Sequence, residues 1–150
     1  MKQSPKDNPK NFEASKFSGD GFLGSDQRPV DEIIADDART LEQVGIPLAQ
    51  LAAAIETAYL AARDALGAPA EISPEVIGEF EESRGRIPCP FRGCGVFEKG
   101  EAIITDRRTN ETLIITSLGI HLIGKHGFFQ GIGSRYRIDP LKAAKILRII

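Results

Sequence analysis

Two segments near the N-terminus carry apolar residues at helical spacing. The first begins at Pro29, which suits the first helical position, and ends at Gly45, a typical helix stop. Its periodic apolar positions are Val30, Ile33, Ile34, Leu41 and Val44. The second segment runs from Pro47 to Gly67 with the same spacing. Because only Gly45 and Ile46 link the two, the pattern predicts an antiparallel helical hairpin over residues 29–67.

In the second half of the chain, β-branched residues replace the helical pattern. The runs Glu101–Asp106 and Glu111–Thr116 flank a polar turn, so we predict an antiparallel β-hairpin there. Upstream, apolar residues between positions 76 and 80 precede Arg84 and Gly85, which suit a hairpin turn. Residues 67–74, with turn residues at both ends, are interpreted as a linker.

Two short helices are predicted toward the C-terminus. Ser117 can cap the first of them, and Gly127 suits its end. Asp139 followed by Pro140 indicates the start of the last helix, which runs toward residue 150. The chain is therefore predicted to be α+β, with a helical hairpin at 29–67 and a small antiparallel β domain with two helices at 75–150.

The first 28 residues are rich in Pro, Ser, Gly, Lys and Asp, and are interpreted as a disordered arm. Phe12, Phe17, Phe22 and Leu23 are exceptions that can fold back on the domain or dock on a partner. No run of about eighteen apolar residues indicates a membrane span. The N-terminus also lacks the apolar segment of a secretory signal. We therefore expect a cytoplasmic protein with no membrane partner.

All cysteines and histidines of the chain fall into two close pairs. Cys89 and Cys94 are separated by four residues, and so are His121 and His126. Thiolate sulfur and imidazole nitrogen are ligands that zinc prefers at a tetrahedral site. In a reducing cytoplasm, two cysteines this close form a metal clip or a redox pair more often than a disulfide. The sequence therefore predicts one zinc ion bound by these four residues.

This arrangement, with the flanking apolar residues Ile87, Phe97 and Leu118, resembles the zinc finger with two cysteines and two histidines. The resemblance covers about residues 87–127. It implies a β-hairpin that carries the cysteines and a helix that carries the histidines. The family has about a dozen residues between the second cysteine and the first histidine, whereas this chain has twenty-six. The extra length is the predicted hairpin at 101–116, so the helix need not present the family's base-reading positions.

Four ligands in two close pairs favour a closed, structural zinc site, because a catalytic zinc keeps one position open for water. With both histidines on the metal, no Ser/His/Asp set remains, and we expect no enzymatic activity. Two other interpretations stay open. One is a reduced cysteine pair beside two unrelated histidines. The other is a redox pair, although such pairs usually have two intervening residues.

Charge is unevenly distributed along the chain. Residues 1–82 contain sixteen acidic and seven basic residues, whereas residues 83–150 contain five acidic and twelve basic ones. We interpret the basic half as a surface for an acidic partner, first of all nucleic acid. The basic residues chosen for that contact are Arg135, Arg137, Lys142 and Arg148. Equally, the two halves can attract each other, within one chain or across a dimer. The alternative function is a protein-interaction or homodimerisation module that uses the helical hairpin and a purely structural zinc.

The glycine-rich segment 131–137 also admits two interpretations. Its amides and arginines can bind a phosphate, while the nearby Phe128, Phe129 and Tyr136 stack on bases. Alternatively, it is a turn whose aromatic residues pack on the core.

Overall fold

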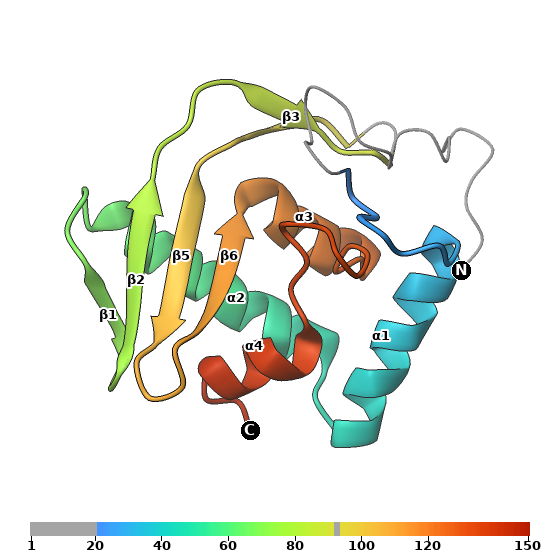
Figure 1. Ribbon diagram of the computed structural model, residues 1–150, viewed down its shortest axis with the longest axis horizontal. Helices are drawn as coiled ribbons and strands as arrows, with labels where there is room; N and C mark the ends of the chain where they lie inside the picture. The colour runs from blue at the N-terminus through green and yellow to red at the C-terminus, as the bar shows by residue number, and fades with distance from the viewer. Residues whose placement is uncertain (1–20, 92–93) are drawn as a thin grey trace.

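The computed structural model describes residues 21–91 and 94–150, and it is an α+β structure (Figure 1). Its elements, in chain order, are α1 (Val30–Val44), α2 (Leu48–Asp64), β1 (Ala70–Ser73), β2 (Val76–Glu81), β3 (Arg86–Pro88), β4 (Val96–Glu98), β5 (Glu101–Asp106), β6 (Glu111–Thr116), α3 (Ser117–His126) and α4 (Pro140–Ile146). Four strands form one antiparallel sheet, and β3 and β4 form a separate two-stranded ribbon. The predicted fold class is confirmed.

The larger sheet has the strand order β1-β2-β5-β6. β5 and β6 pair with Ile103 opposite Ile114. Their connection includes Asn110 at a φ of 60°, a left-handed conformation that asparagine tolerates. Every second residue of these strands faces the core, and the apolar ones are Ala102, Ile104, Leu113 and Ile115. The hairpin predicted from the two β-branched runs is confirmed.

The strands before the ribbon differ from the prediction. β1 lies in the segment interpreted as a linker, and it pairs with β2 through a turn at Pro74 and Glu75. Arg84 and Gly85 are not a hairpin turn, because β2 pairs with β5 while β3 pairs with β4. After β2 the chain leaves the sheet and arches toward the ribbon (Figure 1). β1 has four residues and only one is β-branched, so its strand conformation depends on pairing with β2 rather than on local preference.

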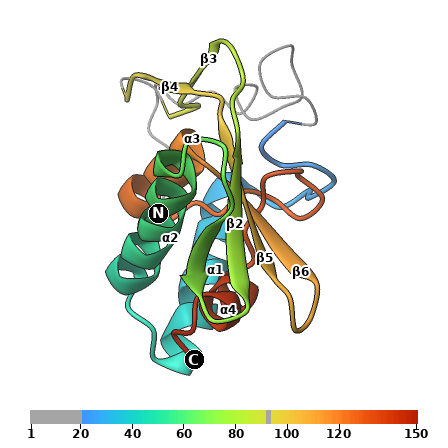
Figure 2. The ribbon, with the colours of Figure 1, turned by 90° about the vertical axis from the view of Figure 1, so that its left-hand side faces the viewer.

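α2 lies across one face of the sheet, as the two views show (Figures 1 and 2). Leu51, Ile55 and Ala62 of this helix are completely buried in the main hydrophobic core. The helix approaches the sheet closely at Gly78 of β2, where an added Cβ would lie 3.1 Å from the Cβ of Ala62. The helical region and the C-terminal half therefore share one core.

α1 and α2 do not form the predicted antiparallel hairpin, because the chain turns by 98° between them. Their boundaries follow the prediction, since Gly45 ends α1 in a left-handed conformation and Pro47 precedes α2. α2 follows the sheet, whose buried strands offer a larger apolar surface, whereas α1 packs against α4. In the described part of the chain, no single helix is long and apolar enough to cross a membrane, and these two pass that test only as a bent pair.

The predicted arm, residues 1–28, lies mostly outside the described residues, which begin at Gly21. From there the chain is packed. Phe22 is 6% exposed, and its carbonyl accepts a hydrogen bond from the amide of Gly131 at 2.8 Å. The amide of Ser25 donates to the carbonyl of Ile132 at 3.1 Å. Phe22 thus folds back on the domain, one of the two outcomes considered for it.

α3 and α4 begin and end near the predicted positions. The cap of α3 is Thr116 rather than Ser117, because the Thr116 hydroxyl accepts a hydrogen bond from the amide of Gly119 at 2.9 Å. Asp139 caps α4, as predicted, by accepting from the amide of Lys142 at 2.9 Å. The helix is shorter than expected and ends at Ile146.

Candidate metal centre

The ribbon of β3 and β4 carries both cysteines. Within it, Ile87 pairs with Phe97, and the amide of Cys89 donates to the carbonyl of Gly95 at 3.1 Å. Gly95 has a φ of 94°, a left-handed conformation that glycine adopts without strain. This backbone bond and the left-handed glycine close the turn that contains Cys94. Residues 92 and 93 of the turn lie outside the described part of the chain.

α3 carries both histidines and packs against β4 of the ribbon. The centroids of the His121 and His126 rings are 5.2 Å apart, with an interplanar angle of 80°. His126 is the last residue of the helix. Gly127 follows it in a left-handed conformation, and its amide donates to the carbonyl of Ile123. The helix end therefore fixes the backbone at the second histidine.

The four side chains converge on one point. Their ligand atoms, two sulfurs and two ring nitrogens, all lie within 4.8 Å of one another. Nε2 of His126 is 3.3 Å from Sγ of Cys94 and 3.7 Å from Sγ of Cys89. Separations of this size allow one ion to contact all four atoms. The residues singled out from the sequence are thus brought together in a group that could hold a metal ion.

Two phenylalanines pack on the histidine rings. Phe91 stacks on His126 with centroids 4.0 Å apart, and Phe97 stacks on His121 at 4.5 Å. Phe91 also meets Phe128 edge-on, at 5.9 Å. The stacking of Phe91 on His126 was not predicted from the sequence, although the position of Phe91 between the two cysteines could have indicated it. Phe128 is completely buried here and is not available to stack on a base.

The surroundings of His121 suit a metal ligand. Burial lowers the pKa of its imidazole, and the positive charge of Lys125 lowers that pKa further. A metal-binding imidazole must be neutral, and a lowered pKa favours that form. Nε2 of His121 is buried and has no hydrogen-bond partner among the described residues. Leaving such a nitrogen unsatisfied costs about 1–3 kcal/mol, and a bound metal ion would remove that cost.

Cys89 belongs to a second hydrophobic cluster, separate from the core over the sheet, and Cys94 packs against it. Its buried members are Phe22, Val30, Ile33, Ile34, Cys89, Phe91, Leu118, Leu122 and Phe128. These residues come from the N-terminal segment, α1, the turn of the ribbon and α3. Phe128 follows Gly127, the residue that caps the end of α3. An ion at the candidate site would therefore add a link between the ribbon and α3 beside this cluster.

Two of the basic residues chosen for an acidic partner are occupied by acids of this chain. Arg137 forms two hydrogen bonds with Asp37, at 2.9 and 3.0 Å, and its side chain is only 13% exposed. Arg148 pairs with Asp106 at 3.1 Å. The hydrogen bond from Arg148 is the largest cause of the lowered pKa of Asp106, and the amide of Arg108 lowers that pKa further, while burial opposes the shift. The Asp37 pair joins the acidic and basic halves within one chain.

The other two basic residues, Arg135 and Lys142, differ in their contacts and exposure. Arg135 pairs with Glu101 at 3.2 Å, yet its side chain stays 56% exposed. The hydroxyl of Tyr136 also donates to Glu101, which holds this part of the loop against the end of β5. Lys142 is half-buried at the start of α4. Of the four, Arg135 therefore keeps the most clearly exposed side chain, and Lys142 forms no ion pair among the described residues.

The glycine-rich segment before α4 uses its amides within the chain. The amide of Ile132 donates to Oδ2 of Asp26 at 3.0 Å. The two segments cross so closely that a Cβ on Gly24 would lie 2.2 Å from the amide nitrogen of Ser134. Phe129 is 2% exposed, within the main core. These contacts agree with the turn interpretation and use several of the amides on which the phosphate interpretation depends.

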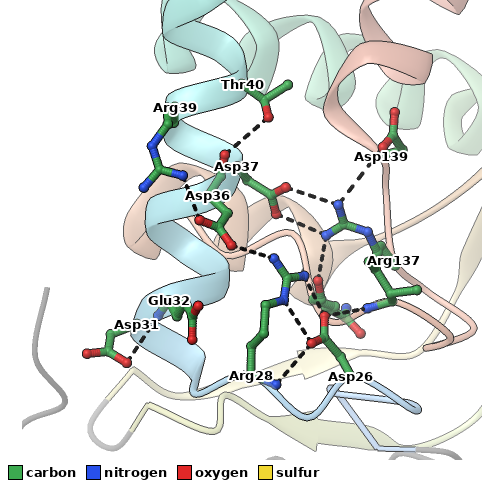
Figure 3. A network of polar contacts seen from close by, with 12 residues as sticks. Asp26, Arg28, Asp31, Glu32, Asp36, Asp37, Arg39, Thr40, Arg137 and Asp139 are labelled. Atoms are coloured by element: carbon green, nitrogen blue, oxygen red, sulfur yellow. Dashed lines mark hydrogen bonds and ion pairs between the residues drawn. The ribbon is translucent and has the colours of Figure 1, made fainter.

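A network of ion pairs fastens the N-terminal segment to α1 (Figure 3). Arg28 donates to Asp26 and, at 2.8 Å, to Asp36. Hydrogen bonding from Arg28 holds the pKa of Asp26 well below its usual range. Hydrogen bonds from Arg39 and then Arg28 lower the pKa of Asp36. Both carboxyl groups are therefore ionised at neutral pH and anchor this segment.

In comparisons with known proteins, no family model matches the chain, and no curated protein or solved structure matches it. The likeness to the two-cysteine, two-histidine zinc finger therefore rests on the ligand group and on the ribbon-plus-helix frame that carries it. The long interval between Cys94 and His121 holds β4, β5 and β6. Two strands of the main sheet thus lie between the two ligand pairs.

Proposed function

We propose that this chain is a binding module whose fold is stabilised by one structural zinc ion at Cys89, Cys94, His121 and His126. The observation that carries the proposal is the convergence of the four ligand atoms within 4.8 Å. Zinc–sulfur bonds of about 2.3 Å and zinc–nitrogen bonds of about 2.0 Å place tetrahedral sulfur and nitrogen ligands roughly 3.5 Å apart. The distances of 3.3 and 3.7 Å from His126 to the two sulfurs lie on either side of that value.

The donor set supports zinc and a structural role. Mg²⁺ and Ca²⁺ take oxygen ligands, whereas two sulfurs and two imidazole nitrogens suit zinc. Four protein ligands complete a tetrahedron, so no position is kept for the water that a catalytic zinc activates. When bound, the ion would supply folding free energy to the second cluster rather than chemistry on a substrate.

The test is the metal content of protein purified without added metal, measured by mass spectrometry. We expect about one equivalent of zinc in the wild type and almost none in Cys94→Ser, because a serine hydroxyl is a poor zinc ligand. Val96→Ser is the matched control, since Val96 is 54% exposed on the same ribbon. A folded wild-type protein without zinc, or full zinc retention in Cys94→Ser, would refute the proposal.

Nucleic-acid binding is the second candidate function, and the side chains that support it do not include Arg137. Arg107 and Arg108 are exposed at the end of the β5–β6 hairpin. Arg148, which follows the end of α4, reaches the same place, because both Arg108 and Arg148 pair with Asp106. Phosphate contacts need accessible cations of this kind. The carboxylates of Asp106 and Glu111 offset part of the charge, so any binding should be weak and strongly dependent on salt.

Fluorescence polarisation with a labelled single-stranded oligonucleotide tests this candidate at about 50 and 200 mM salt. We expect binding at the lower salt that weakens in the double variant Arg107→Gln/Arg108→Gln. Arg63→Gln on α2 is the control. Arg63 is an exposed arginine outside this group, and its only ion pair among the described residues is with Asp64. No binding at low salt, together with a dimer mass by light scattering, supports the protein-interaction alternative instead.

A further inference from the structure

A cavity of about 390 Å³ lies between α1, the start of α2 and the end of α3. Most of its wall is apolar, and its apolar lining includes Ile34, Leu41, Ile46, Leu48 and Phe129. Small-molecule sites in proteins are mostly apolar hollows of about 300–1,000 Å³ with a few polar groups. The cavity is at the small end of that range, which suits a molecule of roughly ten non-hydrogen atoms rather than a nucleotide.

Gly124 forms part of the cavity wall, and its presence there has no packing explanation. Glycine inside a helix is destabilising relative to alanine. Close packing does not require it, because the nearest atom to an added Cβ would be the Cβ of Ala52 at 4.0 Å. A residue that weakens its own helix without a packing reason points to a function at that position. Because Gly124 has no side chain, it lines the cavity with its backbone.

Two side chains of opposite charge complete the lining. Glu42 comes from α1, and Lys125 comes from α3. Both are exposed, and within the described residues neither side chain forms an ion pair. The end of α3 also lies at this wall, and a helix C-terminus carries partial negative charge. An apolar hollow therefore has one anionic and one cationic group available to a ligand.

We propose that this cavity binds a small zwitterion with an apolar body, the chemistry of a free hydrophobic amino acid such as leucine or phenylalanine. The apolar side chain fills the hollow between α1 and α3. The ammonium group faces Glu42 and the end of α3, and the carboxylate faces Lys125. The proposal does not depend on the nucleic-acid candidate, and none of its recognition groups is a metal ligand.

A titration of the full chain, followed by amide NMR shifts, tests the ligand chemistry. The probes are L-leucine and L-phenylalanine, with isopentylamine, 4-methylpentanoate and N-acetyl-L-leucinamide as partial mimics. We expect saturable shifts at Ala38, Gly124 and Gly127 with the two amino acids. Each mimic lacks at least one charged group and should bind at least about tenfold more weakly. Equal binding of N-acetyl-L-leucinamide would overturn the proposal in favour of a protein side chain as the occupant.

Variants locate the site. Gly124→Leu should abolish binding because it puts a bulky side chain on the cavity wall. Gly124→Ala raises the helix propensity by a similar amount with a much smaller side chain, and this variant should still bind the ligand. Glu42→Gln should weaken amino-acid binding about tenfold, with Glu56→Gln on the exposed side of α2 as its control. Zinc content measured on every variant separates this result from the metal proposal. Absence of saturable binding, or undiminished binding in Gly124→Leu, would overturn the assignment.

Discussion

Asp37 of α1 and Arg137 of the loop before α4 form a two-point ion pair across one hundred residues of chain. Both side chains are largely buried, at 8% and 13% exposure. Arg137 also donates to the carbonyl of Gln130 at 2.7 Å, so the guanidinium links α1 with two parts of the loop. One consequence of the uneven charge distribution is therefore a contact within the chain, between its acidic and basic halves.

Removal of this carboxylate should be strongly destabilising. Asp37→Asn leaves the largely buried Arg137 cation with only the exposed Asp139, 3.9 Å away, as a counter-charge. We expect this to lower the free energy of unfolding by about 3 kcal/mol. The control is Asp64→Asn, which breaks an exposed pair with Arg63 and should change stability by less than about 0.5 kcal/mol. Urea denaturation measures both values. Similar losses in the two variants would show that burial of the Asp37 pair is unimportant.

The stacked ring of Phe91 should affect both stability and metal binding. Phe91→Ala removes a buried ring, which we expect to lower the free energy of unfolding by about 3 kcal/mol. It also removes the surface that orients His126, so zinc affinity should fall about tenfold. Phe91→Leu fills much of the volume without a flat face, and should recover stability more than affinity. Competition with a chromophoric chelator measures the affinity, and an unchanged value in Phe91→Ala would contradict the orienting role.

Metal removal should loosen the second cluster before the main core. Cys89 lies in that cluster together with Phe22 and α1 residues, and Cys94 packs against it, whereas the core over the sheet contains none of the four ligands. After chelation, amide hydrogen exchange should rise in β3, β4, the end of α3 and residues 21–29. Exchange in α2 and β5 should change little. An equal rise in all these elements would mean that the two clusters unfold as one unit.

Local signals in the sequence identify some elements and not others. The β5–β6 hairpin is predictable because both strands are β-branched and the turn lies between them. The ends of α1 and α3 are predictable because Gly45 and Gly127 adopt the left-handed conformation that ends helices. β1 was missed because four residues with little strand preference become a strand only by pairing with β2. The angle between α1 and α2 depends on the sheet beneath α2, which no short segment encodes.

The same division applies to the candidate site. The ligand group could be chosen from the sequence because zinc chemistry admits few residue types, and this chain has only two cysteines and two histidines. The ion pairs of Arg137 and Arg148 could not be predicted from the sequence, because their partners lie 100 and 42 residues away along the chain. Exposure of a basic residue is a property of the folded chain. Charge counts alone therefore overstate the surface available to an acidic partner.

Acid should weaken the contact between the N-terminal segment and α1. Hydrogen bonding from Arg28 lowers the pKa of Asp26, and a lowered folded-state pKa stabilises the fold above the unfolded pKa of about 3.9. That contribution is lost as the pH falls from about 4 toward the lower folded value. The wild type should be more stable than Asp26→Asn at neutral pH, and the difference should shrink as the pH drops. Melting temperatures across the acid range measure it, and metal release at low pH affects both proteins alike. A difference that stays constant with pH would contradict this role of Asp26.

The crossing of the N-terminal segment and the glycine-rich loop should tolerate no side chain at Gly24. Gly24 and Gly45 both have left-handed φ values, 57° and 73°, so alanine at either position carries a strain of about 1 kcal/mol. At Gly45 an added Cβ meets nothing within 4 Å, whereas at Gly24 it would lie 2.2 Å from the amide nitrogen of Ser134. Gly45→Ala should therefore cost about 1 kcal/mol, and Gly24→Ala at least about 3 kcal/mol, because two backbone segments must move apart. Phe22 is attached to this crossing, so Gly24→Ala should also speed hydrogen exchange around the metal cluster. Equal losses of stability in the two variants would show that the crossing contributes nothing beyond glycine's backbone conformation.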